Sequence, residues 1–324
     1  MIPLEESIQR GAPMKILITG AAGYIGSVLT PMLVRAGHHV TALDSFMYGN
    51  ETTLAALCKE TNFELHRVDV RDVAALRPHL KNADVVIPLA GLVGAPICNL
   101  NPFNALAVNL YAPIAMFDEM SLDQLCIMPT TESSYGSNDD VCTEETPINP
   151  LSTYAQHKAE VEQALLAREN SISLRLATVF GMSSRMRLDL LVNDFAWQAY
   201  KTNGILLFEE HFKRTVVHVE DVARAFLHAL ENRGTMQNEI YNVGNVSVSK
   251  LELCEAIKVR MAEIGKPFYY TTVPTGSDPD KRNYQVSSEK LLRTGYSFKW
   301  SLEAGLDELF KGFKALKNTV HGNV

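Results

Sequence analysis

Two features of the sequence predict a doubly wound α/β fold, in which helices cover both faces of a parallel sheet. Over residues 15–180, short apolar runs alternate with segments of helical periodicity without a break. The apolar run Lys15–Thr19 also leads directly into three spaced glycines, Gly20, Gly23 and Gly26, and a helical pattern follows them. A strand, a glycine-spaced turn and a helix in this order are typical of a dinucleotide site.

Each glycine of this turn has its own physical purpose. Gly20 permits the tight turn, and Gly23 lets the backbone approach phosphate groups because no Cβ is in the way. Gly26 lets the helix lie close to the strand, and the first helical turn offers unpaired N–H groups and the positive end of a dipole. We therefore predict that the turn binds the pyrophosphate of a dinucleotide. The alternative interpretation is a glycine turn that binds no ligand.

The next two strands indicate which dinucleotide binds. The second strand, His39–Leu43, ends at Asp44, whose carboxylate can accept hydrogen bonds from the ribose hydroxyls of adenosine. No Arg or Lys stands between Asp44 and Lys59 to meet a 2′-phosphate, so NAD is favoured over NADP. The third strand, over residues 63–68, is followed by Asp69, which can accept a hydrogen bond from the adenine amine.

The remaining elements are predicted from the same periodicities and from capping residues. Asn101 and Pro102 suit the cap and the first turn of a long helix. The expected segments are helices near 51–60 and 73–80, a strand over 84–91, the helix from 101 to about 120, a strand over 125–128 and a helix from 153 to about 169.

Composition excludes several classes of protein. Of the 324 residues, 46% are hydrophobic and 21% are charged, as in an ordinary globular protein. The formal net charge of −7 argues against non-specific binding of nucleic acid. Because no apolar run is long enough to span a bilayer and residues 1–13 lack a continuous apolar region, neither a membrane protein nor a secreted one is expected. We expect residues 1–13 to be a short extension before the first strand.

The cysteines indicate the redox environment. Five are present, an odd number with wide spacing, and neither a Cys-x-x-Cys pair nor histidines at metal-ligand spacing accompany them. We predict reduced thiols in a cytoplasmic protein, and no metal site. The five are Cys58, Cys98, Cys126, Cys142 and Cys254.

Chemistry is expected after the strand over 125–128, where Thr131, Glu132 and Ser133 follow in a polar cluster. Further on, Tyr154 and Lys158 are four residues apart and so share one helix face. A phenol has a pKa of about 10, and bringing it near neutrality takes roughly 4 kcal/mol of selective stabilisation of the phenolate. The Lys158 ammonium and a positively charged nicotinamide can supply it, and the Thr131 hydroxyl can hold a substrate alcohol against this base. The alternative is a surface tyrosine beside a solvated lysine.

Together these residues resemble the extended short-chain dehydrogenase/reductase family, in its branch that acts on nucleotide sugars. The resemblance covers nearly the whole chain. Besides the residues above, it rests on Asn109 and on the segments LRLATVFG (174–181, the sixth strand), RTVVHVEDVA (214–223) and DKRNYQVS (280–287).

The resemblance implies two structural units. A Rossmann-like doubly wound sheet is expected over 14–180, with 214–246 returning to it. A smaller C-terminal substrate-binding lobe is expected from 181–213 and 247–320. Members of the family commonly dimerise through the helices that correspond to 101–120 and 153–169, so a homodimer is expected.

The resemblance also implies sites for NAD and for a nucleotide-diphosphate sugar. The guanidinium groups of Arg214 and Arg282 suit the geometry of the diphosphate. For each of these two arginines the alternative is a structural ion pair. His218 and Asp221 are expected to serve in packing and capping. The expected NAD contacts are Gly20, Gly23, Tyr24, Ile25, Gly26, Asp44, Asp69, Val70, Leu89, Ala90, Gly91, Asn109, Tyr154 and Lys158. The expected substrate contacts are Thr131, Ser133, Arg185, Arg187, Arg214 and Arg282.

The branch shares one step, in which a tyrosinate removes the proton of the sugar C4 hydroxyl while hydride passes from C4 to NAD. In its 4,6-dehydratases, a glutamate at the position of Ser133 removes the C5 proton, and a serine has no suitable pKa for that task. Glu132 lies one residue earlier, and alternation along an extended segment points it elsewhere. Dehydration is therefore disfavoured.

A 4-epimerase needs only Thr131, Tyr154, Lys158 and a pocket in which the keto sugar can turn over. We therefore predict C4 epimerisation of the UDP-glucose 4-epimerase type. The alternative is a C4 dehydrogenase or reductase that releases its keto sugar, with Glu132 as an additional catalytic acid or base. Two departures from the family pattern, Thr178 for a common asparagine and Pro88 for a frequent histidine, can reshape the sites.

Two further functions come from other classes. An NAD-binding sensor without catalytic activity is disfavoured because the set Thr131, Tyr154 and Lys158 is intact. A reductase of uncharged carbonyl compounds is disfavoured because its substrate would not call for both Arg214 and Arg282.

Overall fold

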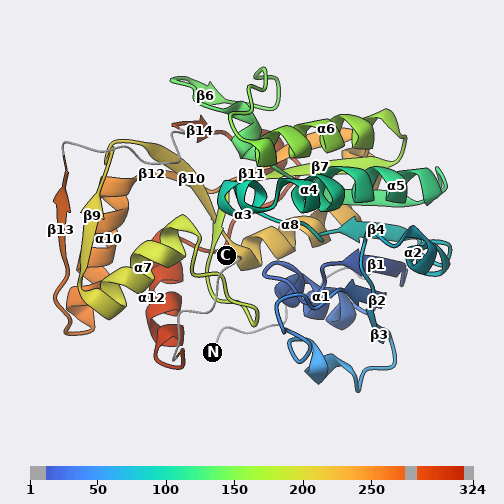
Figure 1. The fold of residues 1–324 in the computed structure, drawn as a ribbon, viewed down its shortest axis with the longest axis horizontal. Helices are drawn as coiled ribbons and strands as arrows, with labels where there is room; N and C mark the ends of the chain where they lie inside the picture. Colours follow the sequence, from blue (N-terminus) through green and yellow to red (C-terminus); the bar gives the residue numbers. More distant parts are fainter. Residues whose placement is uncertain (1–11, 274–282, 317–324) are drawn as a thin grey trace.

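A seven-stranded parallel sheet forms the centre of the molecule (Figure 1). The structure, a computed structural model, describes residues 12–273 and 283–316. The strands pair in the order β11-β7-β5-β4-β1-β2-β3, which is that of a doubly wound sheet. The predicted fold class is therefore confirmed. The strands are β1 (Lys15–Thr19), β2 (His39–Asp44), β3 (Phe63–Arg67), β4 (Val85–Pro88), β5 (Leu125–Thr131), β7 (Ser171–Leu176) and β11 (Glu239–Val243).

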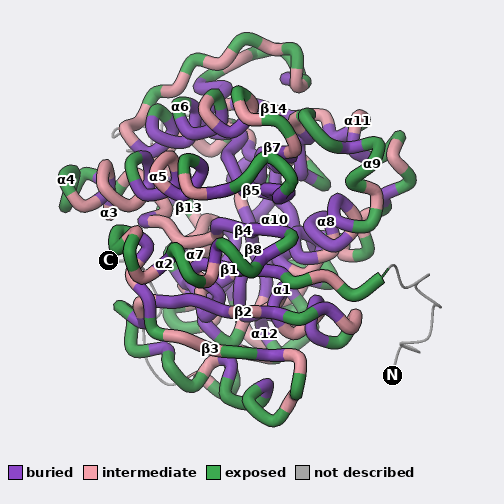
Figure 2. Tube along the Cα trace, turned by 90° about the vertical axis from the view of Figure 1, so that its right-hand side faces the viewer, coloured by how far each residue is buried: buried purple, intermediate pink, exposed green. Residues whose placement is uncertain are grey.

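Helices cover both faces of this sheet and give it two cores. Successive strand residues point to opposite faces, so Ile16 and Ile18 join one core whereas Leu17 joins the other. Helices α1 and α8 pack together on one side, and α2, α5 and α6 on the other. The central strands are accordingly buried (Figure 2). The helices are α1 (Gly26–Arg35), α2 (Val73–Leu80), α3 (Ala95–Leu100), α4 (Pro102–Leu106), α5 (Ala112–Glu119), α6 (Thr153–Ala167), α8 (Val219–Glu231) and α9 (Arg233–Met236).

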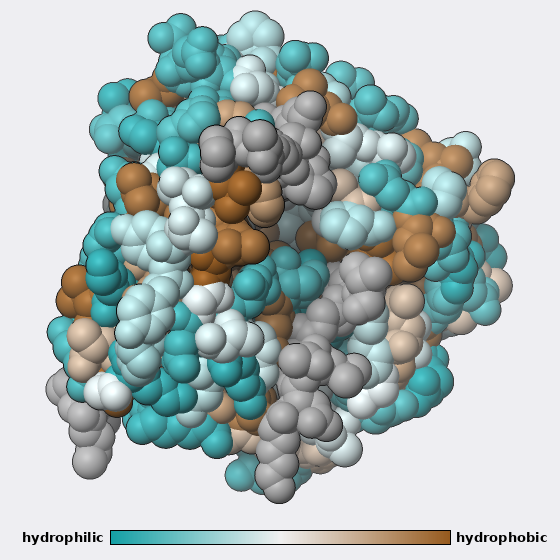
Figure 3. Space-filling model, turned by 60° about the vertical axis from the view of Figure 1, so that its left-hand side comes forward, coloured by the Kyte–Doolittle hydropathy of each residue, from teal (hydrophilic) through white to brown (hydrophobic). Residues whose placement is uncertain are grey.

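A smaller group of elements lies beside this sheet, on the left in Figure 1. Three strands pair in the order β12-β10-β8, β9 pairs with β13, and β6 pairs with β14. On the face in Figure 3, hydrophobic groups are separated by hydrophilic ones. The elements are β6 (Val141–Cys142), β8 (Thr178–Phe180), β9 (Gly204–Leu207), β10 (Lys213–His218), β12 (Val246–Ser249), β13 (Tyr269–Thr272), β14 (Gln285–Val286), α7 (Leu191–Thr202), α10 (Lys250–Glu263), α11 (Glu289–Leu292) and α12 (Leu302–Phe313).

The predicted strand over 174–181 is wrong as a single strand. The chain changes sheets at Ala177, whose N–H donates to Val243 O. Before this residue β7 belongs to the large sheet, and after it β8 pairs with β10 in the three-stranded sheet. The segment 214–246 is divided in the same way, because β10 lies in the small sheet whereas β11 lies in the large one.

Two predicted helices also differ from the structure. Residues 51–60 form turns and a single 3-10 helix, η1 (Ala55–Leu57), because the β-branched Thr52 and Thr53 disfavour an α-helix. The helix predicted from 101 begins as expected, with the Asn101 side chain accepting from Asn104 N at 3.2 Å. It is then interrupted by a π-helical segment, η2 (Ala107–Tyr111), before α5. Such segments occur frequently at functional sites.

Candidate active site

The turn between β1 and α1 has the close packing that a dinucleotide site requires. Gly20 has φ +67°, and a Cβ there would lie 2.6 Å from Ala90 N. A Cβ on Gly26 would lie 2.5 Å from the carbonyl oxygens of Gly20 and Ala21. Ile25 precedes α1 as its N-cap, and its side chain does not cap the helix. These backbones therefore form a cradle that fits the pyrophosphate of NAD.

Asp44 ends β2 beside this turn and is buried. Its two carboxylate oxygens accept from Ala22 N at 3.0 Å and Phe46 N at 2.8 Å. Burial raises the pKa of Asp44, while these two bonds and the nearby Arg185 oppose the rise. A carboxylate has about four lone-pair positions, so acceptor capacity is left for ribose hydroxyls.

The other predicted adenosine contacts lie near the end of β3. Asp69 is partly exposed and pairs with Arg71 at 2.5 Å, which lowers the pKa of the carboxyl. Val70 beside it is buried. On the far side of the turn, Leu89 N donates to Thr19 O at 3.0 Å, so the segment after β4, which continues with Ala90 and Gly91, runs next to the glycine turn.

The loop after β8 packs against the glycine turn between β1 and α1. Tyr24 is buried, and its hydroxyl donates to Gly181 O at 2.7 Å. Ser183 Oγ donates to Tyr24 O at 2.8 Å and lies 2.7 Å from Ser27 Oγ. The guanidinium of Arg185 lies 4.1 Å from the centre of the Tyr48 ring, in the loop after β2. Arg185 therefore lies near Asp44, at the end of β2.

Thr131 is the last residue of β5 and caps the 3-10 helix η3 (Glu132–Tyr135). Its Oγ1 accepts from Ser133 N at 3.1 Å. Both side chains are nearly buried, at 6% and 4% exposure. The predicted polar cluster therefore does lie at the carboxyl end of a central strand, and the bond to Ser133 N leaves the Thr131 O–H free to act as a donor.

Tyr154 and Lys158 are both buried on α6, one turn apart. Lys158 Nζ donates to Pro129 O at 3.0 Å, two residues before Thr131. Burial lowers the pKa of Lys158 to about 8. The ammonium is thus held beside β5, still mostly charged at pH 7 but much easier to deprotonate than an ordinary lysine.

Asn109 organises the loop after β4. From the π-helical segment η2, its side chain donates to Leu92 O at 2.9 Å and accepts from Leu92 N at 2.8 Å. Its amide also donates to Cys98 Sγ at 3.5 Å. Leu92 and Cys98 in turn pack against Tyr154. Cys98 was not predicted at the site, because a single cysteine in an apolar stretch gives no sequence signal of its neighbours.

A buried ion pair fastens α6 to the sheet. Glu162 lies one turn after Lys158 and accepts from Arg175 Nη2 of β7 at 2.5 Å. Thr130 and Ser173 each donate to the same carboxylate at 2.7 Å, and Arg175 also donates to the Tyr135 hydroxyl at 2.9 Å. This pair is not among the predicted contacts, although a charged residue inside an apolar strand is a signal for a buried partner.

Glu132 is fully buried at 0% exposure, and neither carboxyl oxygen has a hydrogen-bond partner among the described residues. Burial raises its pKa well above the usual range, Glu144 adds to the rise, and Arg175 opposes it. The environment therefore favours the protonated carboxyl, which can donate as well as accept a hydrogen bond.

The arginines predicted for the diphosphate differ in their surroundings. Arg187 is buried and engages Asp189 at 2.5 Å and Val93 O at 3.2 Å. Arg214 is 3% exposed, donates to Lys213 O at 2.9 Å and lies 5.7 Å from the centre of the Tyr284 ring. Arg282 lies outside the described residues. His218 caps α8 by accepting from Glu220 N at 3.2 Å, as expected.

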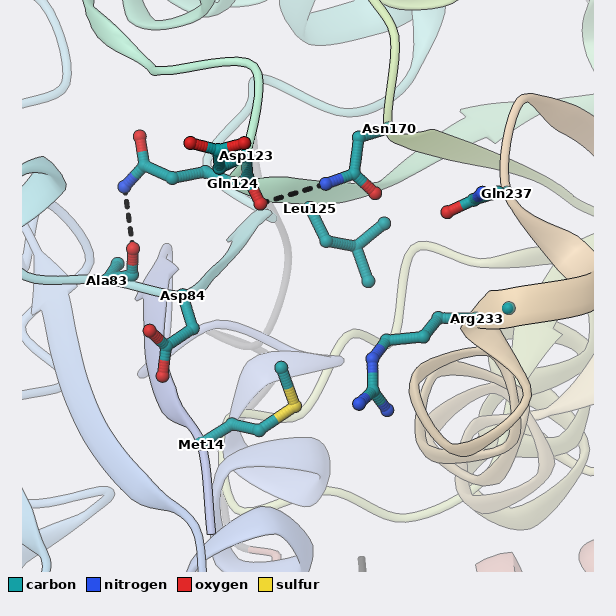
Figure 4. A pocket seen from close by; sticks show the side chains of 10 residues that line it. Met14, Ala83, Asp84, Asp123, Gln124, Leu125, Asn170, Arg233 and Gln237 are labelled. Carbon is teal, nitrogen blue, oxygen red and sulfur yellow. Dashed lines mark hydrogen bonds between the residues drawn. The ribbon is translucent and has the colours of Figure 1, made fainter. Parts of the chain in front are cut away.

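A cavity of about 500 Å³ opens at the opposite edge of the sheet (Figure 4). It is lined by residues at the amino ends of β1, β4, β5 and β7, among them Met14, Asp84 and Leu125. Ligands of open α/β sheets bind at the carboxyl ends of the strands, so this cavity does not belong to the candidate active site.

Among the described residues there is no cluster that could hold a metal and no helix able to cross a membrane.

Comparison with known proteins agrees with this geometry. A family model described as the NAD dependent epimerase/dehydratase family matches residues 16–244. The chain belongs to this family. Its members are NAD-dependent enzymes of nucleotide-sugar metabolism, so the predicted family, enzyme class and NAD cofactor are confirmed at this level.

Relatives in the family carry out different reactions. UDP-glucuronic acid decarboxylase 1 of Danio rerio is 25% identical over 312 residues, which cover 92% of this chain and 72% of the relative. A protein named putative UDP-glucose 4-epimerase, from Methanocaldococcus jannaschii, is 27% identical over 267 residues, covering 78% of this chain and 85% of the relative. The family therefore includes epimerases and decarboxylases as well as dehydratases, and the specific reaction does not follow from membership.

Solved structures show the same fold. UDP-glucuronic acid 4-epimerase from Bacillus cereus, in complex with UDP-glucuronic acid and NAD, has a TM-score of 0.82 and 24% identity, over 94% of this chain and 100% of that one. dTDP-glucose 4,6-dehydratase from Bacillus anthracis, in complex with NAD, has a TM-score of 0.78 and 21% identity, over 93% and 97%. At these identities the likeness concerns the fold.

Proposed function

We propose that the protein oxidises a nucleotide-diphosphate sugar at C4 and returns it as the C4 epimer. The observation that carries this proposal is the arrangement around the end of β5: Thr131 at the strand end, with Tyr154 and Lys158 buried together on α6. Lys158 Nζ, held 3.0 Å from Pro129 O, stands in the same region as the Thr131 hydroxyl.

The roles follow from the chemistry of each group. The Thr131 hydroxyl orients the C4 hydroxyl by a hydrogen bond, and Tyr154 removes its proton as general base. Lys158 stabilises the phenolate by its charge, and desolvation strengthens this interaction because the dielectric response around it is weak. The glycine turn of Gly20, Gly23 and Gly26 would hold NAD, which would supply the hydride acceptor and donor. Arg214 and Arg282 are proposed to hold the sugar diphosphate, with Arg185 and Arg187 as further contacts.

Epimerisation is favoured over dehydration by Ser133. Elimination of water needs a base that removes the C5 proton, and Ser133 offers a hydroxyl that does not ionise near neutral pH. Glu132, whose pKa is raised by burial, is a poor base at this pH. A C4 dehydrogenase or reductase that releases the keto sugar is the second candidate, because a protonated Glu132 can serve as an additional acid.

A panel of nucleotide sugars tests the proposal. The purified protein is denatured to identify any released nucleotide by mass, and the native protein is incubated with UDP-, GDP-, CDP- and dTDP-hexoses. Sugar NMR and the absorbance of reduced nicotinamide are followed together. A C4 epimer without lasting NADH is expected, whereas NADH and a 4-keto product would establish the dehydrogenase. Tyr154→Phe should lower turnover by about 100-fold or more; full turnover would refute the proposed base.

We further propose a homodimer formed through α4, η2, α5 and α6. Two apolar side chains near the start of this helical region are exposed, Leu100 at 69% and Phe103 at 85%. Tyr111, further along at 59% exposure, extends the apolar surface. Exposed aromatic side chains of this kind are frequent anchors of protein interfaces.

A further inference from the structure

We propose that the side chain of Tyr24 couples the two ligand sites, so that binding of NAD and binding of the sugar nucleotide strengthen each other. Tyr24 belongs to the glycine turn between β1 and α1, whose backbone suits the pyrophosphate of NAD. Its side chain leaves this turn and contacts the loop over residues 181–187. The inference rests on the proposed function, because this loop carries Arg185 and Arg187, two of the proposed contacts of the sugar diphosphate.

The Tyr24 hydroxyl is the centre of a buried hydrogen-bond network. Tyr24 is 7% exposed, and Asn193, in the first turn of α7, is fully buried. The hydroxyl donates to Gly181 O at 2.7 Å and accepts from Asn193 Nδ2 at 3.1 Å. The same Asn193 amide donates to Arg187 O at 2.8 Å, and its Oδ1 accepts from Gly181 N at 3.0 Å. The network thus fixes the backbone of the loop at both of its ends.

A second group of bonds fixes the middle of the loop to the same turn. Ser183 Oγ donates to Tyr24 O at 2.8 Å and lies 2.7 Å from Ser27 Oγ, in the first turn of α1. The loop is therefore bonded both to the side chain and to the backbone of Tyr24. A displacement of the glycine turn has to move the loop as well, or else break buried hydrogen bonds at a cost in free energy.

The loop also reaches the segments that follow two other strands. Arg187 Nη2 donates to Val93 O at 3.2 Å, in the segment after β4. The guanidinium of Arg185 lies 4.1 Å from the centre of the Tyr48 ring, in the loop after β2. Together with the glycine turn, which follows β1, these contacts join the carboxyl ends of three parallel strands. This is the edge at which open α/β sheets bind their ligands.

Coupling follows because both sites order the same loop. The glycine turn loses freedom when its backbone N–H groups bind a pyrophosphate, and the bonds of Tyr24 pass this restriction to the loop. Arg185 and Arg187 then meet the sugar diphosphate from a loop that is already ordered, so less conformational entropy is lost in the second binding step. By linkage, the sugar nucleotide strengthens cofactor binding by the same factor. The cofactor is thereby retained while the keto sugar is bound.

The rate of NAD release from the holoprotein measures this coupling. Protein loaded with radiolabelled NAD is chased with excess unlabelled NAD, with and without saturating UDP, or the nucleoside diphosphate of whichever sugar the panel selects. Because this probe has no hexose, contact between the sugar and the nicotinamide does not contribute. The readout is the ratio of the two release rates, since affinity differences between related complexes lie mainly in dissociation rates.

Three variants separate coupling from simple stabilisation of the fold. Tyr24→Phe keeps the ring and removes the hydroxyl. Ser183→Ala removes the second group of bonds from the side of the loop, and it decides the question if Tyr24→Phe does not fold. Tyr269→Phe is the matched control, because it makes the same change on β13 at a side chain that is 71% exposed. Folding of each variant is checked by thermal unfolding, and binding of the nucleoside diphosphate by calorimetry.

The nucleoside diphosphate should slow NAD release about fivefold or more in the wild type and in Tyr269→Phe. In Tyr24→Phe and in Ser183→Ala the slowing should fall below about twofold. Faster release with an unchanged ratio in these two variants would overturn the inference, because the bonds would then only stabilise the site. Absence of slowing in the wild type would overturn it too, and either outcome leaves C4 epimerisation intact. If no nucleoside diphosphate binds and no sugar of the panel turns over, the proposed function fails, and the inference with it.

Discussion

Replacing Lys158 by methionine should make the apoprotein more stable near neutral pH. In the described part of the chain no carboxylate pairs with the buried Lys158 ammonium, and burial lowers its pKa from 10.5 to about 8. A folded-state pKa below the unfolded-state pKa of a lysine means that folding disfavours the charged form. The buried charge therefore lowers the free energy of unfolding. This loss is fully present below pH 8, declines as pH rises from 8, and is gone above pH 10.5.

The magnitude follows from the size of the shift. A difference of about 2.5 pKa units corresponds to roughly 3 kcal/mol of unfolding free energy at pH 7. Lys158→Met also removes the bond from Nζ to Pro129 O, which costs about 1 kcal/mol at any pH. The net gain at pH 7 is therefore about 2 kcal/mol, and it should turn into a loss of about 1 kcal/mol above pH 10.5.

Urea unfolding of the apoprotein between pH 6 and 10.5 measures this difference. Lys311→Met, which alters an exposed lysine on α12, is the matched control and should change stability by less than about 0.5 kcal/mol throughout. If the difference in unfolding free energy between wild type and Lys158→Met stayed constant with pH, the reasoning would be refuted, because only the buried charge makes this difference depend on pH. The variant should also lose most of its turnover, since the phenolate of Tyr154 loses its nearby cation.

Three further outcomes are expected. Glu162→Ala should lower the unfolding free energy by about 3–5 kcal/mol, because it leaves Arg175 buried and unpaired; a urea-measured loss below about 1 kcal/mol would contradict this. Gly20→Ala should weaken NAD binding in calorimetry at least about tenfold, because its Cβ would lie 2.6 Å from a backbone nitrogen. Gly37→Ala, with φ +92° but open space around it, should bind NAD as the wild type does. Phe103→Glu should give a monomer by light scattering, and an unchanged mass would exclude this surface from the interface.

The sequence by itself determined the fold class and the local geometry of the glycine turn. The glycine turn, the carboxylate after the second strand and the alternation of strands and helices are all local, so their spacing carries the structural information. Gly20, Gly26 and Asp44 lie where the motif predicted, and the strand order of the large sheet is that of the predicted fold class. The same holds for Tyr154 and Lys158, because residues four positions apart on a helix share a face.

Only the tertiary structure decided the surroundings of the proposed catalytic groups. The change of sheets at Ala177 depends on pairing with strands more than thirty residues away in the chain, and no local pattern encodes it. Burial of Lys158 and Glu132 likewise results from elements that are distant in sequence, so their shifted pKa values do not follow from neighbouring residues. Burial and the charged or hydrogen-bonding groups nearby are properties of the packed interior, and they determine the pKa values of these side chains.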